Sequence, residues 1–181
     1  MELKFKKLQL ENIELLRSWR NSELVNKSLL SRRQITPEMQ RNWFEANKDG
    51  ENNRIWIASI NDEEFGYVQL SCIDFGNRSA DPGMYICSPE FQGKGLAKHM
   101  MLNLMHHSFE VMNLNKIFGP IIADNVAALS GYLKAGFKIE GYQRRHVHHE
   151  GDFKDLVLVA YSIEEWRNNT IEFVKSESEK W

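Results

Sequence analysis

The stretch of sequence that decides the fold reads Gln92-Gly93-Lys94-Gly95-Leu96-Ala97. It follows the apolar run Met84-Tyr85-Ile86-Cys87 and precedes a long pattern with helical spacing, which predicts a strand, a glycine-rich turn and a helix start. The first N–H groups of a helix have no partner inside the helix, and the helix dipole adds positive potential there. Because two glycines also let an anion approach without meeting a Cβ atom, the stretch predicts a diphosphate site.

The spacing of this stretch excludes the two commonest diphosphate loops. A P-loop requires serine or threonine directly after its lysine, and neither follows here. A dinucleotide fingerprint requires a third glycine where this chain has Lys98. A different pattern, Gln/Arg-x-x-Gly-x-Gly/Ala, is matched by Gln92, Gly95 and Ala97.

A second motif lies some thirty residues later, at residues 124–137. Asp124 is expected to cap a helix N-terminus. Asn125 and Tyr132 are two helical turns apart, so they share a face with Ala128 between them. The closing Gly-Phe pair predicts the end of the helix and the start of a strand.

Together the two motifs resemble the acetyl-CoA loop and the Asn-Ala-Tyr-Gly-Phe pattern of the GNAT N-acetyltransferases. The resemblance covers about residues 55–163. It implies the α/β class and the GNAT acyl-CoA N-acyltransferase fold, in which a central, mostly antiparallel mixed sheet has helices on both faces. It also implies that two central strands splay apart, that acetyl-CoA is the co-substrate, and that the acetyl group is moved to an amine.

The resemblance assigns roles residue by residue. Tyr132 is implied as the general acid, because a phenol of pKa ~10 stays protonated at neutral pH and can donate to a leaving thiolate of pKa ~8.5. Asn125 is implied to bind the pantetheine arm. The full set of implied cofactor contacts is Ile86, Cys87, Gln92, Gly93, Lys94, Gly95, Leu96, Ala97, Asn125 and Ala128.

The general base stays open between four candidates. Relatives of the resembled family often carry a glutamate where this chain has Pro82, and Asp81 is offset by one residue, which reverses side-chain direction on a strand. His146 and His148 share a face of a later strand, and water is the fourth candidate. No carboxylate or cysteine spacing accompanies the histidines, so no metal site is expected.

The N-terminal third predicts the acceptor. Between residues 15 and 43 six cations stand against two anions, and a basic border favours an anionic acceptor. The tripeptide Trp-Arg-Asn at residues 19–21 resembles the branch that acetylates nucleotide-linked amino sugars in the pseudaminic acid pathway. The predicted acceptor is therefore a UDP-linked 4-amino-4,6-dideoxy sugar. The expected acceptor contacts are Trp19, Arg20, Asn21, Tyr85 and His146.

Two alternatives to this acceptor remain open. The first is the N-terminal α-amine of a ribosomal protein, as in the ribosomal-protein acetyltransferase branch, or a small polyamine. The second is a non-catalytic protein that senses acyl-CoA. Members of the resembled family are often dimers, so a homodimer is a further expectation.

Composition places the chain among cytoplasmic globular proteins. Its 181 residues predict a single domain over 1–168, followed by a mobile tail over 169–181. A net charge of −2 gives no drive to bind nucleic acid or an anionic membrane, and the first residues lack the apolar core of a signal peptide. Cys72 and Cys87 are too few for a disulfide framework and are expected to be reduced on buried strands.

Periodicity predicts the order of the elements. Strands are expected at 3–10, 55–60, 65–73, 85–87, 116–123, 137–147 and 155–161. Helices are expected at 13–20 and 22–27, and from residues 37, 96 and 125 onwards. The helix after Gly95 is expected to expose a polar face that includes His99 and Asn103, with Ala97 and Met101 on the opposite face.

Overall fold

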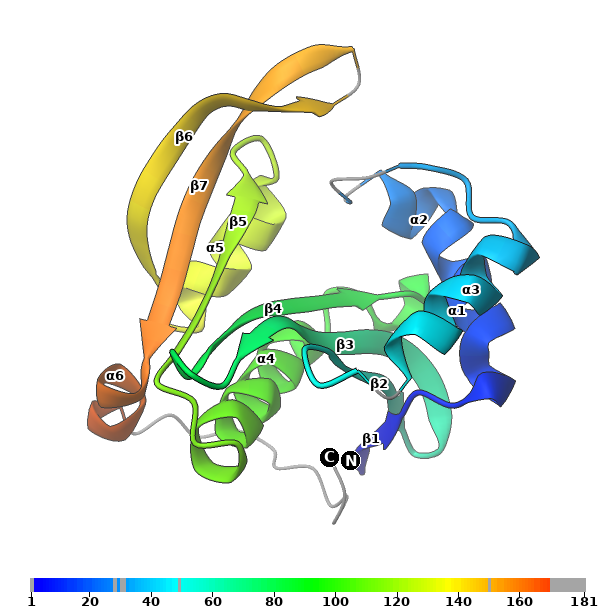
Figure 1. Cartoon of the computed structure of the whole chain (residues 1–181), viewed down its shortest axis with the longest axis horizontal. Coiled ribbons are helices and arrows are strands. Elements are labelled where there is room, and N and C mark those ends of the chain that lie inside the picture. The colour runs from blue at the N-terminus through cyan, green and yellow to red at the C-terminus, as the bar shows by residue number, and fades with distance from the viewer. Residues whose placement is uncertain (1, 28, 30–31, 49, 150, 170–181) are drawn as a thin grey trace.

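A computed structural model describes residues 2–27, 29, 32–48, 50–149 and 151–169. Within these ranges seven strands form one sheet in the order β1-β2-β3-β4-β5-β7-β6 (Figure 1). The strands are β1 (Leu3–Lys7), β2 (Arg54–Ile60), β3 (Glu63–Asp74), β4 (Ser79–Ile86), β5 (Lys116–Ile122), β6 (Lys138–His149) and β7 (Asp152–Ser162). Neighbouring strands are antiparallel except β4 and β5, which confirms the predicted mixed sheet.

Helices cover both faces of this sheet, as predicted. They are α1 (Ile13–Asn21), α2 (Glu23–Asn26), α3 (Pro37–Asn47), α4 (Leu96–His106), α5 (Val126–Lys134) and α6 (Ile163–Asn168). Helices α1 and α3 pack on β2 and β3 through a smaller core cluster, whereas α4 and α5 join the main core on the other face (Figure 1). Helix α6 and the first half of β4 were not predicted, and residues 170–181 of the predicted tail lie outside the described residues.

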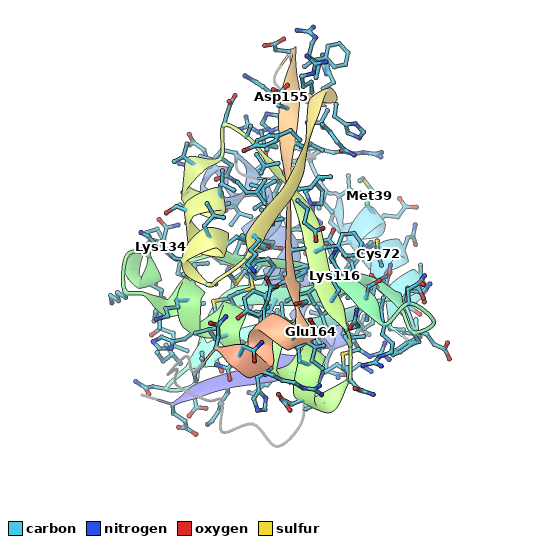
Figure 2. All side chains as sticks on the ribbon, turned by 90° about the vertical axis from the view of Figure 1, so that its left-hand side faces the viewer. Met39, Cys72, Lys116, Lys134, Asp155 and Glu164 are labelled. Atoms are coloured by element: carbon cyan, nitrogen blue, oxygen red, sulfur yellow. The ribbon has the colours of Figure 1, made fainter. Side chains whose placement is uncertain are left out.

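The sheet divides between its two central strands. β4 and β5, both described throughout, pair at Ser79–Lys116 and Ala80–Ile117 and then diverge. β5 pairs with β7 along its whole length, so β5, β7 and β6 rise together away from β1–β4 (Figure 1). The β6–β7 hairpin runs from α6, which carries Glu164, to a tip near Asp155 (Figure 2). This divergence confirms the splay that the family resemblance implies.

Local side-chain chemistry fixes where the helices begin and end. Thr36 Oγ1 accepts a hydrogen bond from the Met39 amide at 3.2 Å, and Pro37 opens α3 as predicted. Asn125, and not the predicted Asp124, caps α5, because its Oδ1 accepts from the Ala128 amide at 3.1 Å. Asp124 instead forms an ion pair with Lys154 at 2.9 Å.

Three predictions about exposure were wrong, those for Asn103, Ala97 and Cys72. Asn103 is 3% exposed, since α4 is enclosed on nearly all sides, and its amide donates to the His99 carbonyl at 2.8 Å instead of to water. Ala97, expected on the buried face, is exposed. Cys87 is buried, whereas Cys72 is exposed at an irregularity of β3, where its φ is +51°. Within the described ranges no helix is long and apolar enough to cross a membrane.

His107 is a buried titratable group in the main core. Its side chain is 5% exposed, and its ring meets Trp56 edge-on with centroids 5.3 Å apart. Burial, with smaller contributions from His106 and Arg54, lowers the pKa of His107 to about 4. The imidazole is therefore neutral in the folded protein at physiological pH.

We expect the free energy of unfolding to fall as the pH is lowered from about 6.5 to about 4, because the unfolded chain binds a proton that buried His107 does not. His107→Gln removes this contribution. In urea unfolding at pH 7.5 and 4.5, the wild type should lose about 2 to 3 kcal/mol more than the variant between the two pH values. Equal losses would show that His107 does not set the acid sensitivity.

Candidate active site

The divergence of β4 and β5 opens a cleft of about 470 Å³. The cleft is lined by the glycine-rich stretch, the first turns of α5, β4, the end of β5 and helix α2. Of the residues predicted to contact the cofactor or to act on it, the lining contains Ile86, Gln92, Gly93, Ala97, Asn125, Ala128 and Tyr132. Two motifs some thirty residues apart in the sequence thus meet in one cavity.

The backbone of β4 presents unpaired polar groups to this cleft. The Cys87 amide donates to the Phe65 carbonyl at 2.7 Å, and the register places Tyr85 opposite Tyr67. Because antiparallel pairs alternate, the odd-numbered residues of β4 bond to β3, and Met84 and Ile86 direct their N–H and C=O groups into the gap. The amide of Cys87, a predicted cofactor contact, is bonded to β3, and Cys87 is not among the residues that line the cleft.

The glycine-rich turn has the backbone conformation that the sequence predicts. Gly93 and Gly95 have φ values of +73° and +77°, and Gly95 is the N-cap of α4. A Cβ atom at either position would meet no protein atom within 4 Å, so the space beside the turn is open. The Lys94 ammonium lies 5.5 Å from the Phe91 ring centroid, and the Leu96 side chain is buried. Lys94 and Leu96 can therefore contact an anion only through their backbone or, for Lys94, after moving.

Tyr132 reaches across the cleft from α5 to β4. Its hydroxyl donates to the Pro82 carbonyl at 2.8 Å, and its ring packs edge-on against Phe137 at 4.9 Å between centroids. Burial raises the pKa of Tyr132, and the nearby Asp81 carboxylate raises it further, so the phenol keeps its proton at neutral pH. The geometry places a proton donor in the wall of the cleft.

Asp81 lies where the two strands part. A Cβ atom on Gly119 of β5 would stand 2.5 Å from its Oδ1, so the carboxylate occupies space that a larger residue would fill. Burial raises the pKa of Asp81 to about 6, which leaves it mostly ionised at pH 7. It lines the cleft on the same face of β4 as Gly83 and Tyr85.

The other base candidates are not brought to the cleft. His146 is exposed at an irregularity of β6, and His148 packs edge-on against Phe153 with centroids 5.4 Å apart. Neither is among the residues that line the cleft. His149, which was not predicted as a base, is buried, and its Nε2 lies 3.1 Å from the Leu29 carbonyl, so it links the hairpin to Leu29.

The predicted acceptor contacts have different positions. Tyr85 lines the cleft and stacks on Tyr67 with centroids 4.7 Å apart. Asn21 is structural, since its side chain both donates to the Ile35 carbonyl at 2.8 Å and accepts from the Ile35 amide at 2.9 Å. Trp19 is partly buried against the smaller core cluster. Arg20 lines a small cavity next to the cleft.

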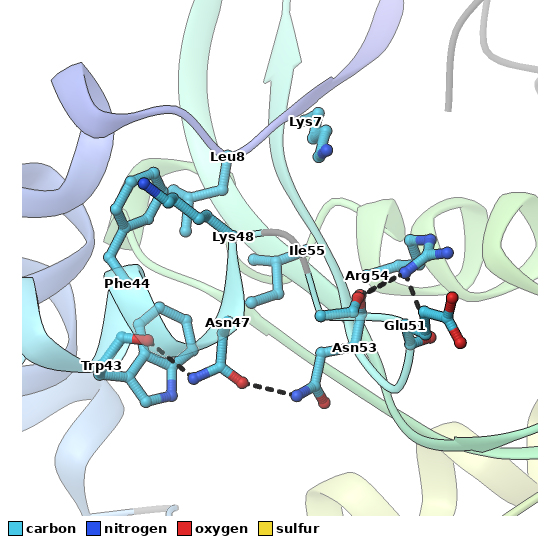
Figure 3. Close-up of a pocket in the computed structure, with 11 residues that line it drawn as sticks. Lys7, Leu8, Trp43, Phe44, Asn47, Lys48, Glu51, Asn53, Arg54 and Ile55 are labelled. Carbon is cyan, nitrogen blue, oxygen red and sulfur yellow. Dashed lines mark hydrogen bonds between the residues drawn. The ribbon is translucent and has the colours of Figure 1, made fainter.

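A further hollow of about 320 Å³ lies between α3 and the start of β2 (Figure 3). Its polar groups bond to one another: Asn47 Nδ2 donates to the Trp43 carbonyl at 2.7 Å, and Asn53 Nδ2 donates to Asn47 Oδ1 at 2.6 Å (Figure 3). It contains no residue of either predicted motif. Within the described ranges no group of three histidine, cysteine or acidic side chains is placed to hold a metal ion.

Comparisons with known proteins agree with this geometry. The family described as "Acetyltransferase (GNAT) domain" matches residues 2–138. Spermidine N(1)-acetyltransferase of Escherichia coli K12 is 31% identical over 107 residues, which are 59% of this chain and 57% of that protein. The putative ribosomal N-acetyltransferase YdaF of Bacillus subtilis is 30% identical over 101 residues, 56% of this chain and 55% of that protein. The chain thus spans little more than half the length of these curated relatives.

A solved structure shares the fold over nearly the whole chain. The crystal structure of spermidine N-acetyltransferase from Vibrio cholerae, in complex with CoA and spermine, superposes with a TM-score of 0.87. The match covers 92% of this chain and 99% of that chain at 21% identity. This likeness shows the fold.

We expect Gly95→Ala to lower the affinity for coenzyme A by about tenfold or more. The alanine side chain costs about 1 to 2 kcal/mol in the left-handed conformation and enters the open space beside the turn. Gly151→Ala is the matched control, because Gly151 has a φ of +81°, equally open surroundings and a position in the β6–β7 turn. Calorimetric titration of both variants with coenzyme A measures the effect. Equal affinities of Gly95→Ala and Gly151→Ala would contradict the assignment of the glycine-rich turn as the diphosphate site.

Proposed function

This chain belongs to the family of GNAT acetyltransferase domains, and from that premise we propose that it transfers the acetyl group of acetyl-CoA to a small primary amine. The observation that carries the proposal is the meeting, in one cleft, of an open glycine turn, unpaired β4 amides and the Tyr132 hydroxyl. None of these features alone is specific to acyl transfer. Together they supply an anion site, a strand-like binding edge and a proton donor.

The cofactor would lie along the whole cleft. The amides of the turn at Gly93 and Gly95 would hold the diphosphate at the positive end of α4. The N–H and C=O groups of Met84 and Ile86 would pair with the pantetheine amides as a neighbouring strand would. Asn125 uses its Oδ1 to cap α5, which leaves its Nδ2 to donate to the same arm.

The chemistry requires a neutral amine, a stabilised carbonyl oxygen and a proton for the departing sulfur. Asp81 would take the proton from the amine, whose nitrogen then attacks the thioester carbon. An unpaired β4 amide would donate to the carbonyl oxygen as negative charge develops there. The carbon–sulfur bond then breaks, and Tyr132 donates its proton to the thiolate. The surplus proton of the acylated nitrogen then passes to the Tyr132 phenolate, which restores the phenol and leaves a neutral amide.

The comparisons favour a different acceptor from the one predicted by the sequence. The relatives reported above are named for spermidine and for ribosomal substrates, so they support the alternative of a polyamine or protein amine more than a UDP-linked amino sugar. Thiol release from acetyl-CoA with spermidine, an N-terminal peptide and a UDP-linked 4-amino sugar would rank these acceptors. A non-catalytic sensor would bind acetyl-CoA and release no thiol with any of them.

We expect Tyr132→Phe to lower turnover by roughly ten- to a thousand-fold in this assay while acetyl-CoA binds nearly normally, because only the proton donor is removed. The matched control is Tyr142→Phe, at a tyrosine that is 65% exposed on β6. Turnover equal to the wild type in the Tyr132 variant would remove this hydroxyl from the mechanism.

We expect kcat/KM to fall as the pH drops below about 6, because protonated Asp81 cannot accept the proton of the amine. Asp81→Asn should lower kcat/KM by about a hundred-fold and abolish this acid limb. The exposed Asp62 on the β2–β3 turn provides the control substitution, Asp62→Asn. An acid limb that persists in the Asp81 variant would assign the base elsewhere.

A further inference from the structure

A small cavity of about 120 Å³ lies beside the cleft, between α1, α3 and β3. Its polar lining comes from Arg20 of α1, Gln40 of α3 and Tyr67 of β3. Tyr67 lines both the small cavity and the cleft, and it stacks on Tyr85, which lines the cleft, so Tyr67 stands at the boundary with Tyr85 beside it. The cavity is therefore adjacent to the face of β4 that carries Asp81.

The polar atoms around this boundary are donors without acceptors. Arg20 Nε, Gln40 Nε2 and Tyr85 Oη are each buried and have no hydrogen-bond partner among the described residues. Gln40 is 2% exposed, so water from bulk solvent does not reach it freely. An unsatisfied buried donor costs about 1 to 3 kcal/mol, which makes three together unusual unless an acceptor joins them.

The charge of Arg20 is also uncompensated. No ion pair links it to a carboxylate within the described part of the chain, whereas Arg17, one turn earlier on α1, is held by Glu14 at 2.8 Å. The positive charge of Arg20 lowers the pKa values of Tyr67 and Tyr85 against the larger opposite effect of burial, which places the guanidinium near both hydroxyls. A partly buried cation without a counterion favours binding of an anion.

We propose that Arg20, Gln40 and Tyr85 form a subsite for a carboxylate carried by the acceptor amine. The proposal rests on the proposed function and names the substrate class as amino-carboxylates. A carboxylate suits the planar guanidinium fork, and its remaining lone pairs can accept from the amide of Gln40 and the hydroxyl of Tyr85. The cavity has the volume of about four water molecules, which admits a carboxylate but not a nucleoside diphosphate.

The same face sets the length of the acceptor. Asp81 and Tyr85 are four residues apart on β4, roughly 13 Å between Cα atoms. Between them stands Gly83, where a Cβ atom would come within 2.8 Å of the Gln69 side chain, so Gln69 covers the strand surface at this point of the cleft. An amine near Asp81 and a carboxylate near Arg20 therefore belong to an extended molecule with several bonds between the two groups. A polyamine would instead direct a second cation at Arg20.

The test compares linear ω-amino carboxylates of increasing length with the amino-amide and the diamine of each length, by thiol release from acetyl-CoA. The wild type should prefer the carboxylate by about tenfold or more in kcat/KM. Arg20→Gln should reduce that preference by about ten- to a hundred-fold and leave coenzyme A affinity unchanged. Gln40→Leu leaves the charge of Arg20 in place and keeps a side chain of similar size in the cavity wall, so it should reduce the preference for the carboxylate only several-fold. Arg41→Gln is the matched control, since Arg41 is exposed on the same helix as Gln40.

Equal use of the carboxylate and the diamine by the wild type, or an unchanged preference in Arg20→Gln, would overturn the subsite. Titration of the carboxylates into the complex with coenzyme A tests the subsite independently of turnover. The subsite is supported if the wild type binds the carboxylate and Arg20→Gln does not. It is overturned if both proteins bind the carboxylate equally or if neither binds it, and the cavity then holds only water. If no acceptor of any class caused thiol release from acetyl-CoA, the proposed function itself would be overturned.

Discussion

The ending of the β4–β5 ladder after two residue pairs is the constraint on which the rest of the structure depends. Unpaired backbone groups inside a protein are costly, so a sheet that stops pairing at its centre requires a replacement partner. β5 pairs with β7 along its full length, and β4 pairs with β3 apart from one irregularity between Ser71 and Asp74, so each strand keeps one ladder. The incomplete edges face each other across the cleft, which places a binding edge in the middle of the domain.

Three side-chain features keep these edges apart. Pro82 has no N–H to offer to β5 at a position whose backbone faces the gap, and its carbonyl is occupied by the Tyr132 hydroxyl. The Asp81 carboxylate fills the space beside Gly119 where the strands begin to diverge. Asp81 and Tyr132, which lie where the strands part, are therefore also the residues for which we propose proton transfer. Their burial is the main cause of the raised pKa values of Asp81 and Tyr132.

Sequence reasoning succeeded where the determinants are local. The glycine turn, the start of α3 at Thr36-Pro37 and the shared face of Asn125 and Tyr132 follow from a few neighbouring residues. It failed where a distant partner decides. The Asn21 side chain is used by Ile35, the Cys87 amide by Phe65, and Asn103 is enclosed by packing around α4. Whether Asp81 faces the acceptor depends on strand register, and the splay itself came from the family resemblance, not from the residues.

The number of cations in a stretch of sequence does not predict which of them faces a binding site, because exposure and pairing differ from one cation to the next. Six cations in the N-terminal third suggested a large anion, yet Lys27, Arg33 and Arg41 are exposed and Arg17 is paired with Glu14. The interactions of exposed charges are largely screened beyond about 10 Å at 0.1 M salt, whereas a cation that faces a cavity interacts through a medium of lower dielectric constant. Arg20 lines the small cavity beside the cleft, and it is the cation of this set to which we assign the proposed acceptor subsite. A small, extended acceptor with one anionic group is compatible with the basic composition, and its reacting amine is of the kind named for the spermidine acetyltransferase relative.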